Sequence, residues 1–423
     1  MAAGYDPLPE AGLRWSSEAL SMKKVLVLGG GKVGKSVGEM LLALGRGEYR
    51  VTLADRDETN LAQAEGNFKR LTSRVPHAVE YTTCTVDATD HAAVRDLLKG
   101  HDYVICMLPF DLVAGVAEAA NELGVHYFDV TEDVETTERV RAIAESGNAK
   151  VALAPQCGLA PGYVAIAAYE IARQFSRIDM LKLRVGALPQ YPTNALRYNT
   201  SWSTTGVINE YCEPCKVMLD GKQVQVPALE GYETFSFGKG FYEAFYTSGG
   251  VGSLIDTLVA ENKTTDETKI AYKTIRYPGH RDLMKFLLED LRLGVEHAEP
   301  GPDGIRFDRR LAVNLIDHGI SRTQQDVVVI FINCVGLKDG FRQQVNFHRS
   351  VRATEMFGRI WPAIEYTTAA GVCAMVELHR LGKLPQTGFI RQEQCPLAEF
   401  NNTVFGLAYE APEKIEQTVL GTG

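Results

Sequence analysis

Long hydrophobic runs are absent from this 423-residue sequence, in which no apolar stretch approaches the roughly 20 residues that span a membrane. An excess of positive charge is also absent, since the net charge is −9. Nucleic acid and anionic membrane surfaces are therefore not expected partners. Internal repeats and low-complexity segments are missing as well. The composition, 45% hydrophobic and 23% charged, predicts a globular protein of two or three domains with a large core.

Cysteine patterns typical of disulfide scaffolds or zinc sites are also lacking. Eight cysteines are scattered through the chain, which favours reduced thiols in the cytoplasm. The one close pair, Cys212-Glu213-Pro214-Cys215, has no second CxxC or His pair to complete a metal site. A redox or half-metal role for it stays open beside a purely structural one. Residues 1–21 carry acidic residues and no continuous apolar core, so we expect a poorly ordered extension and not a signal peptide.

A glycine turn is the strongest signal in the sequence. The apolar stretch Lys24–Leu28 predicts a strand that runs into glycines spaced GxGxxG and then into a helix. Such a turn lets the backbone approach a pyrophosphate and places it at a helix N-terminus. The predicted cofactor contacts at this turn are Gly29, Gly31, Lys32, Val33 and Gly34.

Asp55 lies about 20 residues beyond the turn, at the end of the second predicted strand, where a ribose hydroxyl would be held. Its carboxylate would repel a 2′-phosphate, which favours NAD. The adjacent Arg56 could instead support NADP, so NADP remains possible. A structural alternative for Asp55 is the N-cap of the helix that begins near Glu58.

Strands and helices then alternate up to residue 154, as in a doubly wound parallel sheet. The expected strands are 49–54, 79–86, 103–108, 125–130 and 151–154, and the expected helices are 91–98, 112–123 and 136–146. Ligands of such sheets bind beyond the carboxyl ends of the strands. The residues predicted to meet there are Asp55, Asp87, Leu108, Pro109 and Asp129.

The pattern changes after residue 176, where runs of strands and the turn Asp220-Gly221 predict a mixed sheet with a hairpin. The expected strands are 180–188, 196–202, 217–226, 241–247, 270–277, 326–335 and 342–352. The expected helices are 162–175, 207–211, 252–261, 280–292, 309–318 and 361–381. Pro161 is the candidate first residue of the first of these helices. The fold class is therefore α/β, with a Rossmann domain at 22–155, a second domain with a mixed sheet at 156–360, and a segment at 361–423 that returns to the first domain.

These features together resemble the saccharopine dehydrogenase family, and within it the lysine 6-dehydrogenase branch. The resemblance covers residues 22–405. Each short motif is weak alone, and their order along the chain makes the likeness specific. The motifs are the glycine turn at 29–34, Leu159-Ala160-Pro161-Gly162, Trp202-Ser203, Ile208-Asn209-Glu210-Tyr211 with Glu213-Pro214, Lys273-Thr274-Ile275-Arg276-Tyr277-Pro278-Gly279-His280, and Leu384-Pro385-Gln386-Thr387-Gly388.

The resemblance implies an NAD(P)-binding domain and a second domain that holds an amino-acid substrate and makes a homodimer contact. It also implies hydride transfer between nicotinamide and a carbon that bears nitrogen, at the ε-carbon of lysine or of an N6-substituted lysine. Saccharopine dehydrogenase (L-glutamate-forming) and imine-reducing enzymes of the carboxynorspermidine type are alternatives. A nucleotide-binding regulatory protein without catalysis is a further one.

Amine oxidation requires an unprotonated nitrogen, whereas a lysine ε-amine is normally protonated at neutral pH. The site must therefore take up a proton. Asp129 is the first candidate for this role, because it lies at the end of a predicted strand of the first domain, inside the expected cleft. His280 is the second, since the usual pKa of histidine is close to neutral. The alternative for Asp129 is a helix cap or a carboxylate that orders a loop, and the alternative for His280 is a capping or surface histidine.

The substrate α-carboxylate calls for a guanidinium group. Arg197 and Arg276, both in predicted strands, are the candidates, with structural salt bridges as the alternative. Tyr198 and Trp202 could line the aliphatic part of the substrate or belong to the core. Cys157 could contact substrate or be a small buried residue. Because saccharopine has three carboxylates and lysine one, the few placed cations favour lysine or another small diamino acid.

Overall fold

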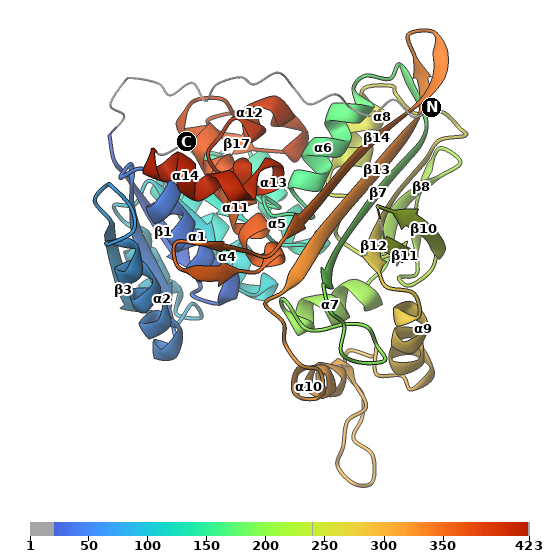
Figure 1. The fold of residues 1–423 in the computed structure, drawn as a ribbon, viewed down its shortest axis with the longest axis horizontal. Helices are drawn as coiled ribbons and strands as arrows, with labels where there is room; N and C mark the ends of the chain where they lie inside the picture. Colours follow the sequence, from blue (N-terminus) through green and yellow to red (C-terminus); the bar gives the residue numbers. More distant parts are fainter. Residues whose placement is uncertain (1–20, 239, 422–423) are drawn as a thin grey trace. The chain divides into compact units, whose positions relative to one another are not determined.

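The computed structural model describes residues 21–238 and 240–421, so the predicted N-terminal extension lies, except for Ser21, outside the described residues. The described chain divides into two compact units (Figure 1). The N-terminal unit contains residues 21–170, Thr354–Trp361 and residues 365–421, and the central unit contains Ile171–Ala353 and Pro362–Ile364. This division falls later than the predicted boundary at 155/156, which stays a prediction.

The N-terminal unit is built on a seven-stranded sheet in the order β17-β6-β5-β4-β1-β2-β3. Every pairing in this sheet is parallel, which confirms the doubly wound Rossmann prediction. The strand order reverses between β1 and β4, the place where ligands of such sheets bind. The strands are β1 (Lys23–Leu28), β2 (Tyr49–Asp55), β3 (Glu80–Thr85), β4 (Tyr103–Cys106), β5 (His126–Asp129), β6 (Ala152–Ala154) and β17 (Gly388–Phe389).

Helices connect these strands and start at residues that the sequence marks. The side chains of Asp57, Asp90 and Asp133 accept backbone N–H groups and cap α2, α3 and α5. β4 is shorter than predicted, because Pro109 already serves as the N-cap of α4. The helices are α1 (Lys32–Leu44), α2 (Glu58–Leu71), α3 (His91–Leu98), α4 (Phe110–Leu123), α5 (Val134–Glu145) and α6 (Tyr163–Ala172).

Helix α6 begins at Tyr163 and not at Pro161 as predicted. Gly162 has φ +136, which is not a helical conformation. The long C-terminal helix is confirmed as α11 (Ala363–Arg380), followed by α12 (Leu397–Asn401), α13 (Leu407–Glu410) and α14 (Ile415–Leu420). The described residues from 365 onward belong to the N-terminal unit, and the predicted domain bounds for 361–423 stay a prediction.

A buried ion network ties this returning segment to α1. Glu39 is fully buried and pairs with Arg359 at 2.6 Å and with Arg70 at 2.7 Å. Arg359 also contacts Glu365 at 3.0 Å, and its guanidinium lies 3.6 Å from the ring centroid of Trp361. Arg359 stands in the small hairpin β15 (Thr354–Met356) and β16 (Arg359–Trp361), so these charges join segments more than 300 residues apart.

The central unit contains a mixed sheet in the order β10-β11-β12-β7-β13-β14, with β8 pairing β12 and β9. Only the β12–β7 pairing of this sheet is parallel within the described strands. Figure 1 shows the long strands β7, β13 and β14 side by side. The strands are β7 (Arg177–Pro189), β8 (Cys215–Leu219), β9 (Lys222–Val226), β10 (Glu233–Phe237), β11 (Gly240–Tyr246), β12 (Lys269–Arg276), β13 (Asp326–Lys338) and β14 (Phe341–Arg352).

The hairpin at Asp220-Gly221 is confirmed, and both residues have the positive φ of a type I′ turn, +49° and +71°. The strand predicted over 196–202 is wrong. The Asn194 side-chain amide donates to the Tyr198 carbonyl at 2.6 Å, so a side chain satisfies backbone there in place of a neighbouring strand. The helices are α7 (Thr204–Cys212), α8 (Leu254–Ala260), α9 (His280–Lys285), the π-helix η1 (Phe286–Asp290) and α10 (Arg309–Gly319).

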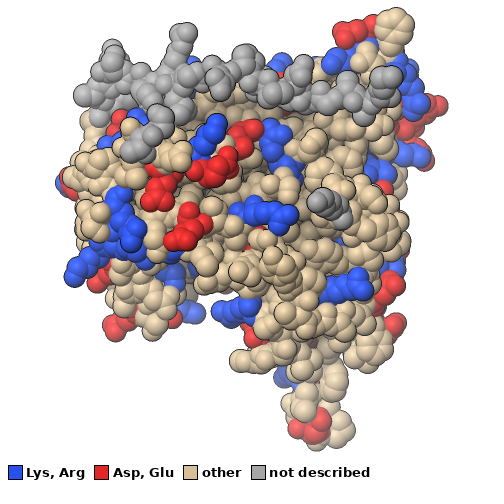
Figure 2. Space-filling view, in the orientation of Figure 1, with Lys and Arg blue, Asp and Glu red and all other residues tan. Residues whose placement is uncertain are grey.

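Acidic and basic side chains are interspersed on the face shown in Figure 2. Several exposed ones pair, among them Arg50 with Glu80 and Lys99 with Asp96. Exposed pairs contribute little to stability, so the buried network around Glu39 matters more. Within residues 21–238 and 240–421, each helix is too short or too polar to cross a lipid bilayer.

We expect Arg359→Met to destabilise the N-terminal unit by about 3 kcal/mol, because Glu39 would keep a buried charge with one partner fewer. Hydrogen exchange of the α1 amides and urea unfolding would measure the effect. Arg50→Met, which removes an exposed pair, is the control and should cost about 1 kcal/mol or less. Equal effects of the two variants would contradict the importance of the buried network.

Candidate functional site

The glycine turn between β1 and α1 is shaped by close backbone approach. A Cβ on Gly34 would lie 1.9 Å from the carbonyl oxygen of Gly29, and one on Gly29 would lie 2.6 Å from that of Met107. Gly29 also has φ +109. Packing therefore requires glycine at both positions. Gly31 differs, because a Cβ there would meet nothing within 4 Å.

The space beside Gly31 is where a pyrophosphate would approach. Gly31 is the N-cap of α1, and no side chain caps the helix there. The N–H groups of the first turn, at the positive end of the helix dipole, therefore remain available to a phosphate. Lys32 and Val33, the other two predicted contacts, open this first turn. The geometry fits a dinucleotide.

Asp55 is held at the end of β2 and supports the turn. Its Oδ2 accepts the Gly30 N–H at 2.5 Å, and its Oδ1 accepts the Asp57 N–H at 2.7 Å. The helix cap that was the alternative for Asp55 is provided by Asp57 instead. Each carboxylate oxygen retains a lone pair, so the predicted ribose contact remains compatible with this arrangement. The neighbouring Arg56 is exposed.

Asp87, Leu108 and Pro109 lie beyond the carboxyl ends of β3 and β4, as predicted. Asp87 is exposed, and its Oδ1 accepts the backbone N–H and the hydroxyl of Thr89 at 2.9 and 2.8 Å. These bonds from Thr89 lower the pKa of Asp87. The residue is therefore an ordered anion at the rim of the sheet.

Asp129 is fully buried, and all of its recorded bonds hold local structure. Its Oδ2 accepts the Tyr127 hydroxyl at 2.7 Å, and its Oδ1 accepts the N–H groups of Thr131 and Gln156 at 2.9 and 3.0 Å. Burial raises its pKa to about 6, against these hydrogen bonds. Asp129 thus joins the loops after β5 and β6. A catalytic role for Asp129 stays a prediction.

Cys157 is also buried, with 1% exposure, and its thiol donates to the Ala154 carbonyl at 3.2 Å. Burial raises the pKa of this thiol well above its usual value. The Cys157 thiol thus contacts protein, and a substrate contact at Cys157 stays a prediction.

Sequence reasoning missed Glu132, a half-buried carboxyl three residues beyond the end of β5 whose pKa is raised by burial. Its position just past a strand end was the available signal.

Arg276 is the centre of a buried aromatic cluster in the central unit. It lies on β12 with 3% exposure. Its guanidinium is 5.2 Å from the ring centroid of Tyr198 and 5.7 Å from that of Tyr211. One nitrogen, Nη1, donates to the Ile275 carbonyl at 2.9 Å, whereas Nε has no hydrogen-bond partner in the described chain. The hydroxyl oxygen of Tyr198 is also unpartnered there.

His280 belongs to the same cluster. Its Nδ1 bonds the Leu196 carbonyl at 3.0 Å, which assigns that proton and leaves Nε2 to accept from the Tyr211 hydroxyl at 3.1 Å. Burial, followed by the charge of Arg276, lowers the pKa of His280 to about 3. The near-neutral pKa on which its predicted role as a base depended is therefore lost. Whether His280 acts in catalysis stays a prediction.

Arg197 and Trp202, two further predicted substrate residues, differ in their surroundings. Arg197 is exposed, in a turn with φ +51, and not in a strand as predicted. Trp202 is half-buried and packs against the aliphatic and aromatic core that includes Tyr198 and Tyr211. Of the four predicted substrate side chains in the central unit, the structure brings Tyr198, Arg276 and Trp202 to one cluster and leaves Arg197 outside it.

Three more cations of the central unit surround one carboxylate on the opposite face of the sheet. Glu233 pairs with Lys182, Arg184 and Lys273 at 2.8, 2.7 and 3.1 Å. Burial would raise its pKa, but these cations lower it to about 2. Lys273 is in register with Arg184. Because side chains alternate along a strand, Arg276, three residues after Lys273, faces the other side.

The CxxC pair does not form a reactive site in the described chain. Cys212 and Cys215 are both free thiols. Burial raises their pKa values to about 11 and 12, so both are protonated at neutral pH. Residues 21–238 and 240–421 hold no cluster of three or more His, Cys, Asp or Glu side chains suited to a metal ion.

Comparison with known proteins identifies the family. The model for the saccharopine dehydrogenase NADP binding domain matches residues 25–156. The model for the saccharopine dehydrogenase C-terminal domain matches residues 158–406. The chain belongs to the saccharopine dehydrogenase family. The family and the geometry of the turn support an NAD(P)-dependent oxidoreductase. The preference for NAD over NADP stays a prediction.

Relatives of this family member are distant. The chain is 30% identical over 211 residues to the mitochondrial alpha-aminoadipic semialdehyde synthase of Mus musculus, a match that covers 48% of this chain and 21% of that protein. It is 25% identical over 324 residues to the saccharopine dehydrogenase [NADP(+), L-glutamate-forming] of Pyricularia oryzae, covering 74% of this chain and 67% of that one. The match thus spans about a fifth of the mouse protein's length.

A solved structure shares the fold. The apo saccharopine dehydrogenase (L-Glu forming) of Saccharomyces cerevisiae superposes with a TM-score of 0.70 at 16% identity, covering 91% of this chain and 97% of that one. This likeness confirms the predicted combination of a Rossmann domain and a second domain with a mixed sheet.

We expect Gly31→Ala to leave folding intact and to weaken NAD(P)H binding about tenfold or more, because the added methyl occupies only the space of the pyrophosphate. Gly34→Ala is the matched comparison and should lower stability itself, since its Cβ meets the Gly29 carbonyl. Thermal unfolding and nucleotide fluorescence titration separate the two effects. Unchanged nucleotide binding by Gly31→Ala would contradict the assigned turn.

The pKa of His280 predicts acid sensitivity of the central unit. The unfolded histidine takes up a proton below its usual pKa of 6.5, whereas the folded one does so only near 3. The contribution of His280 to the free energy of unfolding is therefore fully present above pH 6.5. It decreases as the pH drops, by about 2 kcal/mol at pH about 5. Urea unfolding across pH should show a flatter profile for His280→Gln. Identical pH profiles would contradict the buried neutral histidine.

Proposed function

We propose that the protein oxidises the C–N bond at the ε-carbon of lysine, or of another small diamino acid, to an imine that water converts to a semialdehyde. The family supports oxidoreductase chemistry at a carbon that bears nitrogen. NAD(P)⁺ at the glycine turn would supply the hydride acceptor. The proposed substrate depends on Arg276, because the Nε of this buried guanidinium has no hydrogen-bond acceptor among the described residues.

A buried guanidinium is costly unless an anion and hydrogen bonds compensate it. Arg276 is enclosed by Tyr198 and Tyr211, and its Nε is unpartnered in the described residues. A substrate α-carboxylate would accept from this nitrogen, and the two rings would pack against the aliphatic part of the substrate. Against the effect of burial, the negative charge of Glu210 helps to raise the pKa of Arg276. The same charge would repel the substrate carboxylate, so the attraction of Arg276 must outweigh this repulsion.

The number of cations favours a substrate with one carboxylate. Lys182, Arg184 and Lys273 could have bound further carboxylates, but they surround Glu233 on the opposite face from Arg276. Saccharopine, with three carboxylates, is the second candidate substrate. The names of the Pyricularia oryzae and Saccharomyces cerevisiae relatives favour it, and contacts from outside the central unit would then be needed.

The reaction also requires that the amine lose a proton before hydride leaves its carbon. Glu132, three residues beyond the end of β5, is our candidate to accept this proton. Asp129, the predicted base, already accepts three hydrogen bonds, so it serves to position the loop that carries Glu132. Burial raises the pKa of Glu132, which favours uptake of a proton by this carboxylate. An amine proton would pass to this carboxylate while the C–H electron pair leaves as hydride.

The test is reduction of NAD⁺ and of NADP⁺, measured separately with lysine, ornithine, 2,4-diaminobutyrate and saccharopine. We expect activity with lysine, and we expect Arg276→Met to raise its KM about 10- to 100-fold, the cost of one charged hydrogen bond. Lys182→Met, on the opposite face of the sheet, is the control and should leave KM unchanged.

Activity with saccharopine but not lysine would replace the proposed substrate with the second candidate. An unchanged KM in Arg276→Met would remove this residue from the substrate site. Absence of reduction with every amine, together with absence of imine reduction in the reverse direction, would favour a nucleotide-binding regulatory protein.

A further inference from the structure

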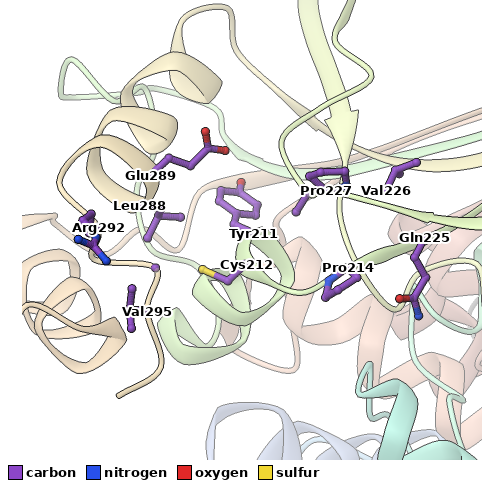
Figure 3. Close-up of a pocket in the computed structure, with 12 residues that line it drawn as sticks. Tyr211, Cys212, Pro214, Gln225, Val226, Pro227, Leu288, Glu289, Arg292 and Val295 are labelled. Atoms are coloured by element: carbon purple, nitrogen blue, oxygen red, sulfur yellow. The ribbon is translucent and has the colours of Figure 1, made fainter. Parts of the chain in front are cut away.

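The central unit contains a cavity of about 620 Å³ that the proposed reaction does not use. Figure 3 shows it between the end of α7, the segment after β9, and the π-helix η1 with the loop that follows. Its volume is in the range typical of small-molecule sites. The ring of Tyr211 forms one wall, whereas the hydroxyl of Tyr211 bonds His280. The cavity therefore adjoins the aromatic cluster without including Arg276.

One side of the cavity is built from unusual backbone. The Leu291 N–H bonds the Phe286 carbonyl at 2.9 Å, a π-type turn that is rare and often found at functional sites. Arg292 then has φ +58, a left-handed conformation that only glycine adopts without cost. The Gly294 N–H returns to the Leu288 carbonyl at 2.9 Å. This backbone keeps the segment that carries Glu289 and Arg292 against the cavity.

Two charged side chains, Glu289 and Arg292, line this side of the cavity, and both are exposed. Glu289 contacts Lys285 at 3.3 Å, and Lys285 bonds Glu230 more closely, at 2.5 Å. Neither an ion pair nor a side-chain hydrogen bond is recorded for Arg292 within the described residues. The cavity therefore offers a solvent-exposed guanidinium and an exposed carboxylate that contacts the same lysine as Glu230. Figure 3 shows Glu289 and Arg292 on the helix side, with Pro214, Val226 and Pro227 across from them.

We propose that this cavity is a second small-molecule site that binds an α-amino acid with an apolar side chain. The α-carboxylate accepts hydrogen bonds from the Arg292 guanidinium. The ammonium group donates to Glu289. The hydrocarbon side chain packs on Leu288, Val226 and Pro227, which are lining residues without charge. The inference does not depend on the proposed reaction, because binding is measured directly.

Calorimetric titration with L-leucine tests this site, with 4-methylpentanoate and 3-methylbutylamine as ligands that lack the ammonium or the carboxylate. We expect leucine to bind, and each analogue to bind about tenfold more weakly or worse, because each loses one charged contact. Arg292→Met should weaken leucine binding about tenfold or more. Val295→Trp, which fills the cavity from an exposed position, should abolish it.

Two control variants locate the binding. Arg322→Met removes an exposed arginine with a weak contact to Asp317 at 4.0 Å and should leave leucine binding unchanged. Arg276→Met should also retain leucine binding, since Arg276 does not line the cavity. Thermal unfolding of every variant shows that it is folded.

Three results would overturn the proposal. The first is the absence of leucine binding, and the second is binding that survives both Arg292→Met and Val295→Trp. The third is loss of binding in Arg276→Met, which would assign leucine to the substrate cluster. Equal affinity for leucine and 4-methylpentanoate would contradict the role given to Glu289.

Discussion

Close approach of backbone to backbone at the glycine turn is the constraint on which the nucleotide site depends. Gly34 and Gly29 are in contact to such a degree that a single Cβ would overlap a carbonyl oxygen. This contact fixes how α1 leaves β1, and Asp55 holds the turn from the next strand through the Gly30 N–H. The uncapped end of α1 then faces open space at Gly31. An NAD(P) site follows from this packing.

Buried charges differ in how completely their hydrogen-bonding groups are satisfied within the described residues. Glu39 is compensated by two arginines, and Asp129 by three hydrogen-bond donors. Arg276 differs, because aromatic rings surround it and its Nε is unpartnered within the described chain. A charge that the fold leaves incompletely satisfied indicates a ligand more strongly than a residue type does. This reasoning separates Arg276 from Arg197, which is exposed.

The sheet of the central unit determines which cations can act together. Lys273 and Arg276 are three residues apart in the sequence, yet they face opposite sides of β12. Lys273 joins Lys182 and Arg184 around Glu233, whereas Arg276 joins Tyr198 and Tyr211. One face is thus a satisfied ion cluster. The other is an aromatic cluster around Arg276, the site that we propose for the substrate carboxylate.

The sequence by itself determined the parallel sheet, the glycine turn, the family and the Asp220-Gly221 hairpin, because these depend on local periodicity and on residues with special backbone freedom. Only the tertiary structure decided the state of Asp129, the low pKa of His280 and the irregular course of 196–202. Their causes are burial and distant partners: the carbonyl that holds His280, for example, is 84 residues away. Hydrogen-bond partners and the dielectric environment of a residue are set only when such distant segments pack together. A local sequence pattern therefore does not predict these pKa values or this irregular backbone.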